Sequence, residues 1–262
     1  MDLQLKDRTV IVTGASSGVG LATARYLLGE GARVAACARD MQRLSAAFEE
    51  FTFADPDQIL LGTCDVTDKS KTDAFVALTN DRFGGIDGLV CNAGRSLMAT
   101  LDETSEEQFR EEFELKIFGA WNMVRSARGE LARSGQGSIV NVNAILSRQP
   151  ETRLAATSAA RAALLNLTHS LSADLAPEGT RVNSVLLGLI DTGQWRRRFE
   201  VANTTQSYEE WSAEIALDRG IGMGRFGTAE EVAYHIVTML SPLSGFTTGA
   251  SVDVGGGVGR YI

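Results

Sequence analysis

Short apolar runs recur along the first half of the chain at a spacing of about 25 residues. They cover residues 9–13, 33–37, 59–64 and 86–91, and two later runs lie at 138–142 and 181–187. Runs of this length that are apolar on both faces are typical of buried strands. The stretches between them have helical periodicity, and we expect helices near residues 19–29, 41–53, 69–82, 105–133, 153–175 and 228–240. We expect a last strand over residues 250–254.

Strands that alternate with helices predict an α/β fold: a Rossmann-type, doubly wound parallel sheet of about seven strands with helices on both faces. No shift in composition divides the 262 residues, so we expect a single domain over residues 1–262.

One stretch, residues 191–222, interrupts the alternation of strands and helices, and we call it the insertion. Its apolar and aromatic residues lie three or four apart, as in Trp195 and Phe199, or Tyr208, Trp211 and Ile215. This pattern predicts two short amphipathic helices whose apolar sides face the cofactor cleft or a partner subunit. We interpret the insertion as a substrate lid. Its run of three arginines, residues 196–198, either attracts an anionic substrate or forms a solvated face.

The balance of charges excludes some classes of partner. The chain has 25 Lys and Arg against 33 Asp and Glu, a formal net charge of −8. A binder of nucleic acid or of an anionic membrane needs a basic surface, so neither is expected. The N-terminus lacks the features of a signal peptide, and no apolar run reaches the roughly 18 residues of a membrane span, which favours a cytoplasmic protein. Histidines, cysteines and carboxylates show no metal-ligand spacing, so we predict no catalytic metal.

A glycine-rich turn follows the first strand: Thr13-Gly14-Ala15-Ser16-Ser17-Gly18-Val19-Gly20. Glycines at 14, 18 and 20 let the backbone approach a pyrophosphate, and the following helix offers free N–H groups at its N-terminus. Ser16 and Ser17 can add hydroxyl hydrogen bonds to the phosphate or the adenosine ribose. The alternative is a tight strand-to-helix turn without a ligand.

Arg39 stands about 20 residues beyond the glycines, where NAD-binding folds place an acidic residue on the ribose 2′-hydroxyl. A guanidinium there fits the 2′-phosphate of NADP and favours NADP(H) over NAD(H). Asp40 is the next residue and weakens this interpretation, and a solvated arginine is the alternative.

With these features the chain resembles the classical short-chain dehydrogenase/reductase family over nearly its whole length. The matching motifs, after the turn at 13–20, are Cys64-Asp65-Val66, Asn92-Ala93-Gly94, Gly137-Ser138-Ile139-Val140-Asn141, Arg181-Val182-Asn183-Ser184-Val185, Gly224-Arg225-Phe226-Gly227, Thr248-Gly249 and Val252-Asp253-Val254-Gly255-Gly256. The resemblance implies that Asp65 and Val66 hold the adenine and that residues 92–94 line the ribose and pyrophosphate. It also implies that Gly188, Ile190 and Thr192 contact the nicotinamide end.

The catalytic residues of the family are replaced here. Ala144 stands at the position of the family's serine, Thr157 at its tyrosine, Arg161 at its lysine and Lys116 at its asparagine. Leu187 also replaces a usual proline before Gly188.

These replacements change the available acid-base chemistry. A threonine hydroxyl cannot do the acid-base work of a tyrosine, and an arginine keeps its proton, although Arg161 can still bind the nicotinamide ribose. Lys116 is the one new titratable group. Either it points to the cofactor with a lowered pKa, or it reaches solvent. Asn143 can bond a carbonyl oxygen unless its side chain points to the opposite face of the strand.

Three functions remain open from the sequence. The first is an NADP(H)-dependent oxidoreductase on a carbonyl or alcohol, whose proton comes from Lys116 or from a water held by Thr157 and Asn143. The second is a non-redox enzyme such as a lyase, and the third is a catalytically silent NADP-binding sensor or partner subunit. The family resemblance also implies a homotetramer, in which the helices at 105–133 and 153–175 pair across a two-fold axis and residues 257–262 reach a neighbour.

Overall fold

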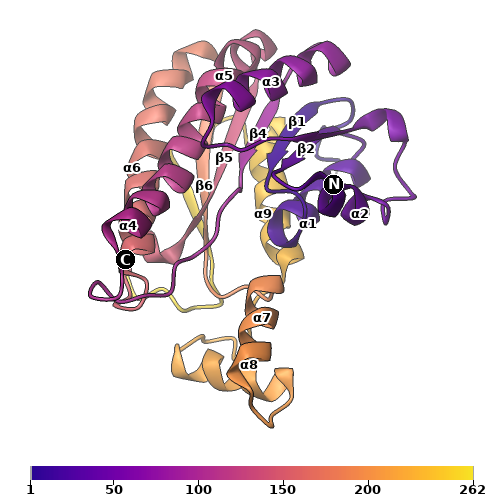
Figure 1. The fold of residues 1–262 in the computed structure, drawn as a ribbon. Coiled ribbons are helices and arrows are strands. Elements are labelled where there is room, and N and C mark those ends of the chain that lie inside the picture. The colour runs from indigo at the N-terminus through magenta and orange to yellow at the C-terminus, as the bar shows by residue number, and fades with distance from the viewer. Residues whose placement is uncertain (1, 262) are drawn as a thin grey trace.

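The computed structural model describes residues 2–261 and confirms the predicted α/β architecture (Figure 1). One parallel sheet has the strand order β3-β2-β1-β4-β5-β6-β7. The strands are β1 (Thr9–Thr13), β2 (Arg33–Ala38), β3 (Ile59–Thr63), β4 (Gly88–Cys91), β5 (Gly137–Ala144), β6 (Thr180–Leu187) and β7 (Ser251–Val254). Because the strand order reverses between β1 and β4, a crevice is expected at the carboxyl ends of these two strands.

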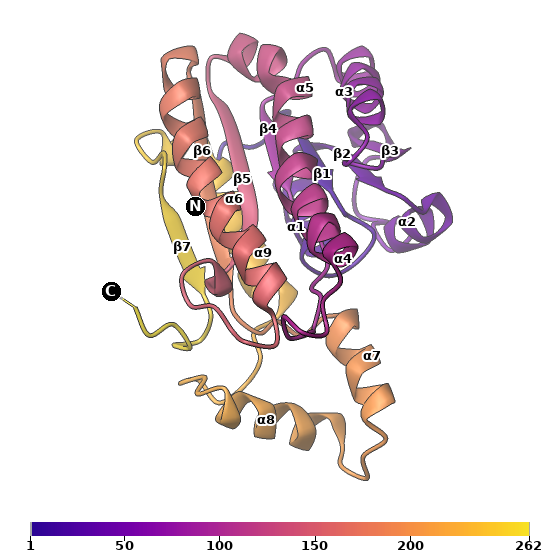
Figure 2. The same cartoon turned by 60° about the vertical axis from the view of Figure 1, so that its left-hand side comes forward.

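Helices cover both faces of the sheet. They are α1 (Gly18–Gly29), α2 (Met41–Phe48), α3 (Lys69–Phe83), α4 (Glu106–Phe113), α5 (Gly119–Ser134), α6 (Ala155–Leu175), α7 (Gly193–Ala202), α8 (Tyr208–Asp218) and α9 (Ala229–Leu240). Figure 2 shows α3, α5 and α6 on one face, and α1 and α9 on the other. Each face has its own buried apolar cluster, around Leu27 and Val232 on one side and around Met123 and Leu164 on the other. No helix within residues 2–261 is long and apolar enough to cross a membrane.

Two expected helices differ from the structure. The predicted helix 41–53 ends at Phe48, because Phe51 leaves the helix and packs its ring edge-on against Phe48 at 4.8 Å. The predicted single helix 105–133 is divided into α4 and α5 by a π-helical segment, Glu114–Phe118. This segment packs against α6, as α4 does, whereas α5 packs against α3. The wider turn of the π-helix therefore lets α4 pack against α6 while α5 packs against α3, without a loop between the two helices.

The insertion forms the two predicted helices, α7 and α8, which project beyond the carboxyl edge of the sheet (Figures 1 and 2). The expectation that their apolar sides face the cleft or a partner is corrected in part. The rings of Phe199 and Tyr208 pack against Trp211, and Trp195 packs against Phe226 at 4.8 Å. Most of the apolar surface of the insertion thus joins α7 to α8. Of the five aromatic and apolar residues named above for the insertion, Trp195 alone lines the large cavity described below.

Candidate active site

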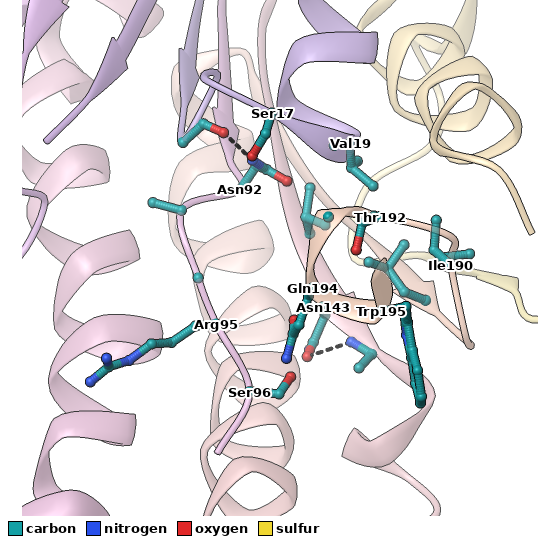
Figure 3. A pocket seen from close by; sticks show the side chains of 18 of the residues that line it. Ser17, Val19, Asn92, Arg95, Ser96, Asn143, Ile190, Thr192, Gln194 and Trp195 are labelled. Carbon is teal, nitrogen blue, oxygen red and sulfur yellow. Dashed lines mark hydrogen bonds between the residues drawn. The ribbon is translucent and has the colours of Figure 1, made fainter. Parts of the chain in front are cut away.

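A cavity of about 600 Å³ opens at the carboxyl ends of the strands, as the reversal of strand order predicts. The predicted cofactor residues that line it are Gly14, Ser16, Ser17, Gly18, Val19, Arg39, Asp65, Val66, Asn92, Ala93, Gly94, Arg161, Gly188, Ile190 and Thr192. Figure 3 shows Ser17 and Val19 on one side of this cavity and Thr192 and Ile190 on another. Of the predicted set, Gly20 does not line it.

The glycine turn is held by close backbone contacts. Gly14 has a φ of +64°, and a Cβ on it would lie 2.9 Å from the Cα of Ala93. A Cβ on Gly20 would lie 2.5 Å from the carbonyl oxygen of Gly14, so Gly20 lets α1 pack against the turn. The Asn92 amide donates to the carbonyls of Thr13, at 2.9 Å, and of Gly14, at 3.1 Å. Asn92 therefore joins the end of β4 to the turn that follows β1.

The end of β2 presents two guanidinium groups to the cavity. Arg39 and Arg43 both line it. Asp40 is the N-cap of α2, and its Oδ1 accepts a hydrogen bond from the Arg43 N–H at 3.0 Å. The Asp40 carboxylate is therefore engaged at the helix start, and two cations flank it. This donor set fits a 2′-phosphate better than a free ribose hydroxyl. Arg43 was missed from the sequence, although its place in the first turn of the helix after Arg39 is a usable signal.

Lys116 lies in the protein interior and forms an ion pair there. Its side chain is 1% exposed, so the alternative in which it reaches solvent is wrong. Its Nζ donates to Oε2 of Glu112 at 2.6 Å. Burial and the nearby charge of Arg161 lower the pKa of Lys116 to about 8, although Glu112 acts in the opposite direction. Glu112 was not singled out in the sequence, because it stands among the acidic residues of an otherwise exposed helix.

Thr157 belongs to the same buried group. Its hydroxyl donates to the Glu112 oxygen that Lys116 also contacts, and it accepts the Leu97 N–H at 3.1 Å. Neither Thr157 nor Lys116 lines the large cavity. The structure thus brings these two predicted catalytic residues together. Both side chains bond to Glu112 in the interior, and neither is exposed to the large cavity.

Arg161 connects this buried group to the cavity. It lines the large cavity and also a small one, with room for about one water molecule, that Lys116 lines as well. Its Nη1 donates to the carbonyl of Val142 at 2.6 Å, and its buried Nε has no partner among the described residues. Burial lowers the pKa of Arg161 to about 10, against the effect of Glu112.

The Asn143 side chain is directed at the backbone. Its Nδ2 donates to the Arg161 carbonyl at 3.0 Å. Its Oδ1 accepts the Ala144 N–H at 2.9 Å (Figure 3). These bonds join the end of β5 to α6. Asn143 also lines the large cavity, and the second N–H of its amide remains available there.

Two polar side chains that sequence reasoning missed line the cavity beside this centre. Ser96 and Gln194 point to the region next to Asn143 in Figure 3. Arg95 extends away from that region and pairs with Glu111 at 2.7 Å. Nothing in the sequence around Ser96 or Gln194 distinguishes them from other loop residues, since only the fold brings them to one cavity.

Within residues 2–261, no three histidine, cysteine or carboxylate side chains are grouped so that they could hold a metal ion.

Comparison with known proteins gives the family. A family model described as enoyl-(acyl carrier protein) reductase matches residues 14–259. An oxidoreductase of Mycobacterium bovis, itself uncharacterised, is 32% identical over 258 residues, which are 98% of each chain. The chain belongs to the short-chain dehydrogenase/reductase family.

Solved relatives add what each of them binds. A short-chain oxidoreductase of Pseudomonas aeruginosa PAO1, described as containing an atypical catalytic centre, is 41% identical, with a TM-score of 0.93 over 98% of this chain and 99% of that one. The same protein has been solved with NADPH bound, with a TM-score of 0.91 at the same coverage. The L-sorbose reductase of Gluconobacter frateurii, solved with NADPH and L-sorbose, is 27% identical, with a TM-score of 0.93 over the whole of both chains.

Proposed function

We propose that this protein is an NADP(H)-dependent oxidoreductase that interconverts a carbonyl compound and its alcohol through a non-standard proton-transfer centre. The observation that carries the proposal is the arrangement at the end of β2. Arg39 and Arg43 line the cavity there, while Asp40 is engaged in capping α2. The oxidoreductase family of the chain and the NADPH bound by its solved relatives support the same cofactor.

When bound, NADPH supplies a hydride to the carbonyl carbon of the substrate and becomes NADP⁺, and the carbonyl oxygen takes a proton to become a hydroxyl. Residues 14–19, Arg39, residues 92–94 and Arg161 would hold the cofactor, and Gly188, Ile190 and Thr192 would hold its nicotinamide end. The remaining requirement is a source for the proton.

We place that source at Lys116, with Glu112 as the positioning residue. An ammonium whose pKa is near 8 can give and regain a proton under ordinary conditions. Lys116 and Arg161 share the small cavity, and a water there would connect the ammonium to the wall of the large cavity. The alternative source, a water held by Thr157 and Asn143, is less favoured because Thr157 does not line the large cavity and its hydroxyl already donates to Glu112.

The test is a panel of carbonyl compounds and alcohols, followed at the nicotinamide absorbance, with NADPH binding measured in parallel. Turnover supports the proposal. Tight NADPH binding without turnover on any substrate favours a silent NADP-binding protein, and conversion of a substrate without a change in the cofactor favours a non-redox enzyme such as a lyase.

We also propose a cytoplasmic homotetramer that acts on a small molecule. Phe118, the last residue of the π-helical segment and the one before α5, is 46% exposed, as expected for a helix that pairs with a second copy. Of the C-terminal residues 257–262 expected to reach a neighbour, Ile262 lies outside the described residues.

A further inference from the structure

The large cavity is lined by many arginines although the whole chain is acidic. The seven are Arg39, Arg43, Arg95, Arg161, Arg197, Arg198 and Arg219. Arg95 pairs with Glu111, and Arg219 pairs with Glu151. Arg39 and Arg43 lie at the end of β2, where the 2′-phosphate is expected. The remaining two, Arg197 and Arg198, belong to the insertion, and neither pairs with a carboxylate of the described residues.

The run of three arginines in α7 is divided between two roles. Arg196 does not line the cavity. Its Nη2 lies 2.7 Å from Oδ2 of Asp191, and its guanidinium carbon lies 3.9 Å from the ring centre of Tyr208. Arg197 and Arg198 line the cavity. Within residues 2–261, neither of these two has a hydrogen bond or an ion pair with another side chain or with a carbonyl.

Arg198 is held in place by an aromatic surface. Its guanidinium carbon lies 4.5 Å from the ring centre of Trp195, and Trp195 packs in turn on Phe226 at 4.8 Å. Arg198 is partly buried, which lowers its pKa, yet an arginine stays charged. Arg197 is exposed and Arg198 is half-buried, so water solvates both charges, and both guanidinium groups are available to an anion that enters the cavity.

The position of Arg198 separates it from the 2′-phosphate site. Arg198 lies against Trp195, which Figure 3 shows near Ile190 and Asn143, whereas Ser17 of the glycine turn lies at the far side of the cavity. Arg39 follows β2, and Asn143 belongs to β5, three strands away in the sheet. An anion held at Arg198 would therefore lie toward Trp195 and Asn143, where the substrate is expected.

We propose that the insertion binds an oxyanion group of the substrate through Arg198, assisted by Arg197, so that the substrate is a carbonyl compound carrying a carboxylate or a phosphate. Arg198 is then the residue that determines specificity for the charged group. This inference rests on the proposed function for the carbonyl part of the substrate, but the oxyanion site stands on the geometry of the insertion alone.

The first experiment measures ligand binding without turnover. With NADP⁺ at saturation, butanoate, methyl phosphate and neutral butanamide are titrated while tryptophan fluorescence is followed. We expect wild-type protein to bind one of the two anions more tightly than butanamide, and the tighter anion identifies the charged group. Arg198→Met should weaken that binding by about tenfold to a hundredfold, as expected for the loss of a charge-assisted hydrogen bond, with a partial effect for Arg197→Met. Arg82→Met, which removes an exposed arginine on α3, is the matched control and should change nothing.

The second experiment measures kcat/KM with NADPH for an oxo acid and its methyl ester. Arg198→Met should lower kcat/KM for the acid and leave the ester nearly unchanged. Equal affinity of wild type for butanoate, methyl phosphate and butanamide would overturn the inference, and so would equal effects of Arg198→Met on acid and ester. Anion binding that depends on Arg198 but without any carbonyl turnover would support the oxyanion site and contradict the proposed function.

Discussion

Glu112 and Lys116 form an ion pair inside the protein, with Oε2 and Nζ 2.6 Å apart and both side chains at most 4% exposed. Removing two charges from water is costly, and such a pair persists only when the two groups compensate each other closely. Thr157 donates to the same carboxylate. The three residues therefore form one unit, and a change in one alters the other two.

Removal of the Lys116 charge alone should destabilise the fold. Lys116→Met leaves the buried Glu112 carboxylate unpaired, which should cost about 3–5 kcal/mol in the free energy of unfolding. The double variant Glu112→Gln, Lys116→Met removes both charges and keeps an acceptor for Thr157, so it should recover most of that loss. Urea denaturation of the four proteins of this cycle measures the coupling. Independent, additive effects would contradict a buried pair in solution.

Loss of Lys116 should also stop turnover without loss of cofactor binding. In the double variant, which should fold, carbonyl reduction should fall to background. NADPH affinity should change little, because the predicted cofactor residues line the large cavity and Lys116 and Glu112 do not. Cofactor fluorescence and absorbance measure the two quantities. Full turnover in this variant would mean that the proton comes from another group.

The rate should depend on pH in opposite senses for the two directions. If Lys116 supplies the proton, as proposed, reduction needs its protonated form. We then expect kcat/KM for reduction to fall as pH rises through about 8, and kcat/KM for alcohol oxidation to rise over the same range. In Lys116→Arg the side chain stays protonated, so any remaining reduction should lose this decline near pH 8. An unchanged profile in that variant would assign the pH dependence to another residue.

Cofactor preference should depend on Arg39 more than on Asp40. Arg39→Ala should weaken NADPH binding by about 1.5–3 kcal/mol, or one to two decades, and leave NADH binding nearly unchanged. Arg43→Ala should act in the same direction. Asp40→Asn keeps an N-cap acceptor and should alter neither affinity, because the carboxylate already accepts the Arg43 N–H. Equal affinities of the wild type for the two cofactors would contradict the preference for NADP(H).

The assembly should respond to the exposed aromatic residue beside α5. Light scattering at micromolar concentration should give the mass of four chains for the wild type. Phe118→Asp places a charge at the expected helix pair and should lower that mass to that of a dimer or monomer. Leu217→Asp changes an exposed apolar residue of α8 and serves as control. A monomeric wild type would refute the tetramer.

The features that could be predicted from the sequence are those set by residues close together in the chain. The glycine turn at 13–20, the Asn92 position and all seven strands could be predicted, because each depends on residues close together in the chain. The division of the helix at Glu114–Phe118 could not, since an α-helix and a π-helix share the same apolar residues and only packing against α6 selects between them.

The side-chain partners of Lys116 and Asn143 could not be predicted from the sequence either. Lys116 could be recognised as unusual, but its partner Glu112 is one of several acidic residues in α4, and only burial singles it out. The direction of Asn143 depends on where α6 starts relative to β5, which is a tertiary property. For the same reason the sequence could not predict that Arg196 pairs with Asp191 while Arg198, two residues later, lies over the Trp195 ring.

The π-helical segment between α4 and α5 holds one residue more than a regular helix needs over the same length. Deletion of a single residue there could therefore be absorbed as ordinary α-helix, without a new loop and without loss of the neighbouring strands. Each residue of an α-helix turns by about 100°, so such a deletion would rotate α4 and Glu112 relative to α5. A change of length at this segment could thus alter which side chains meet Lys116 and Thr157, while the sheet and the large cavity stay as they are.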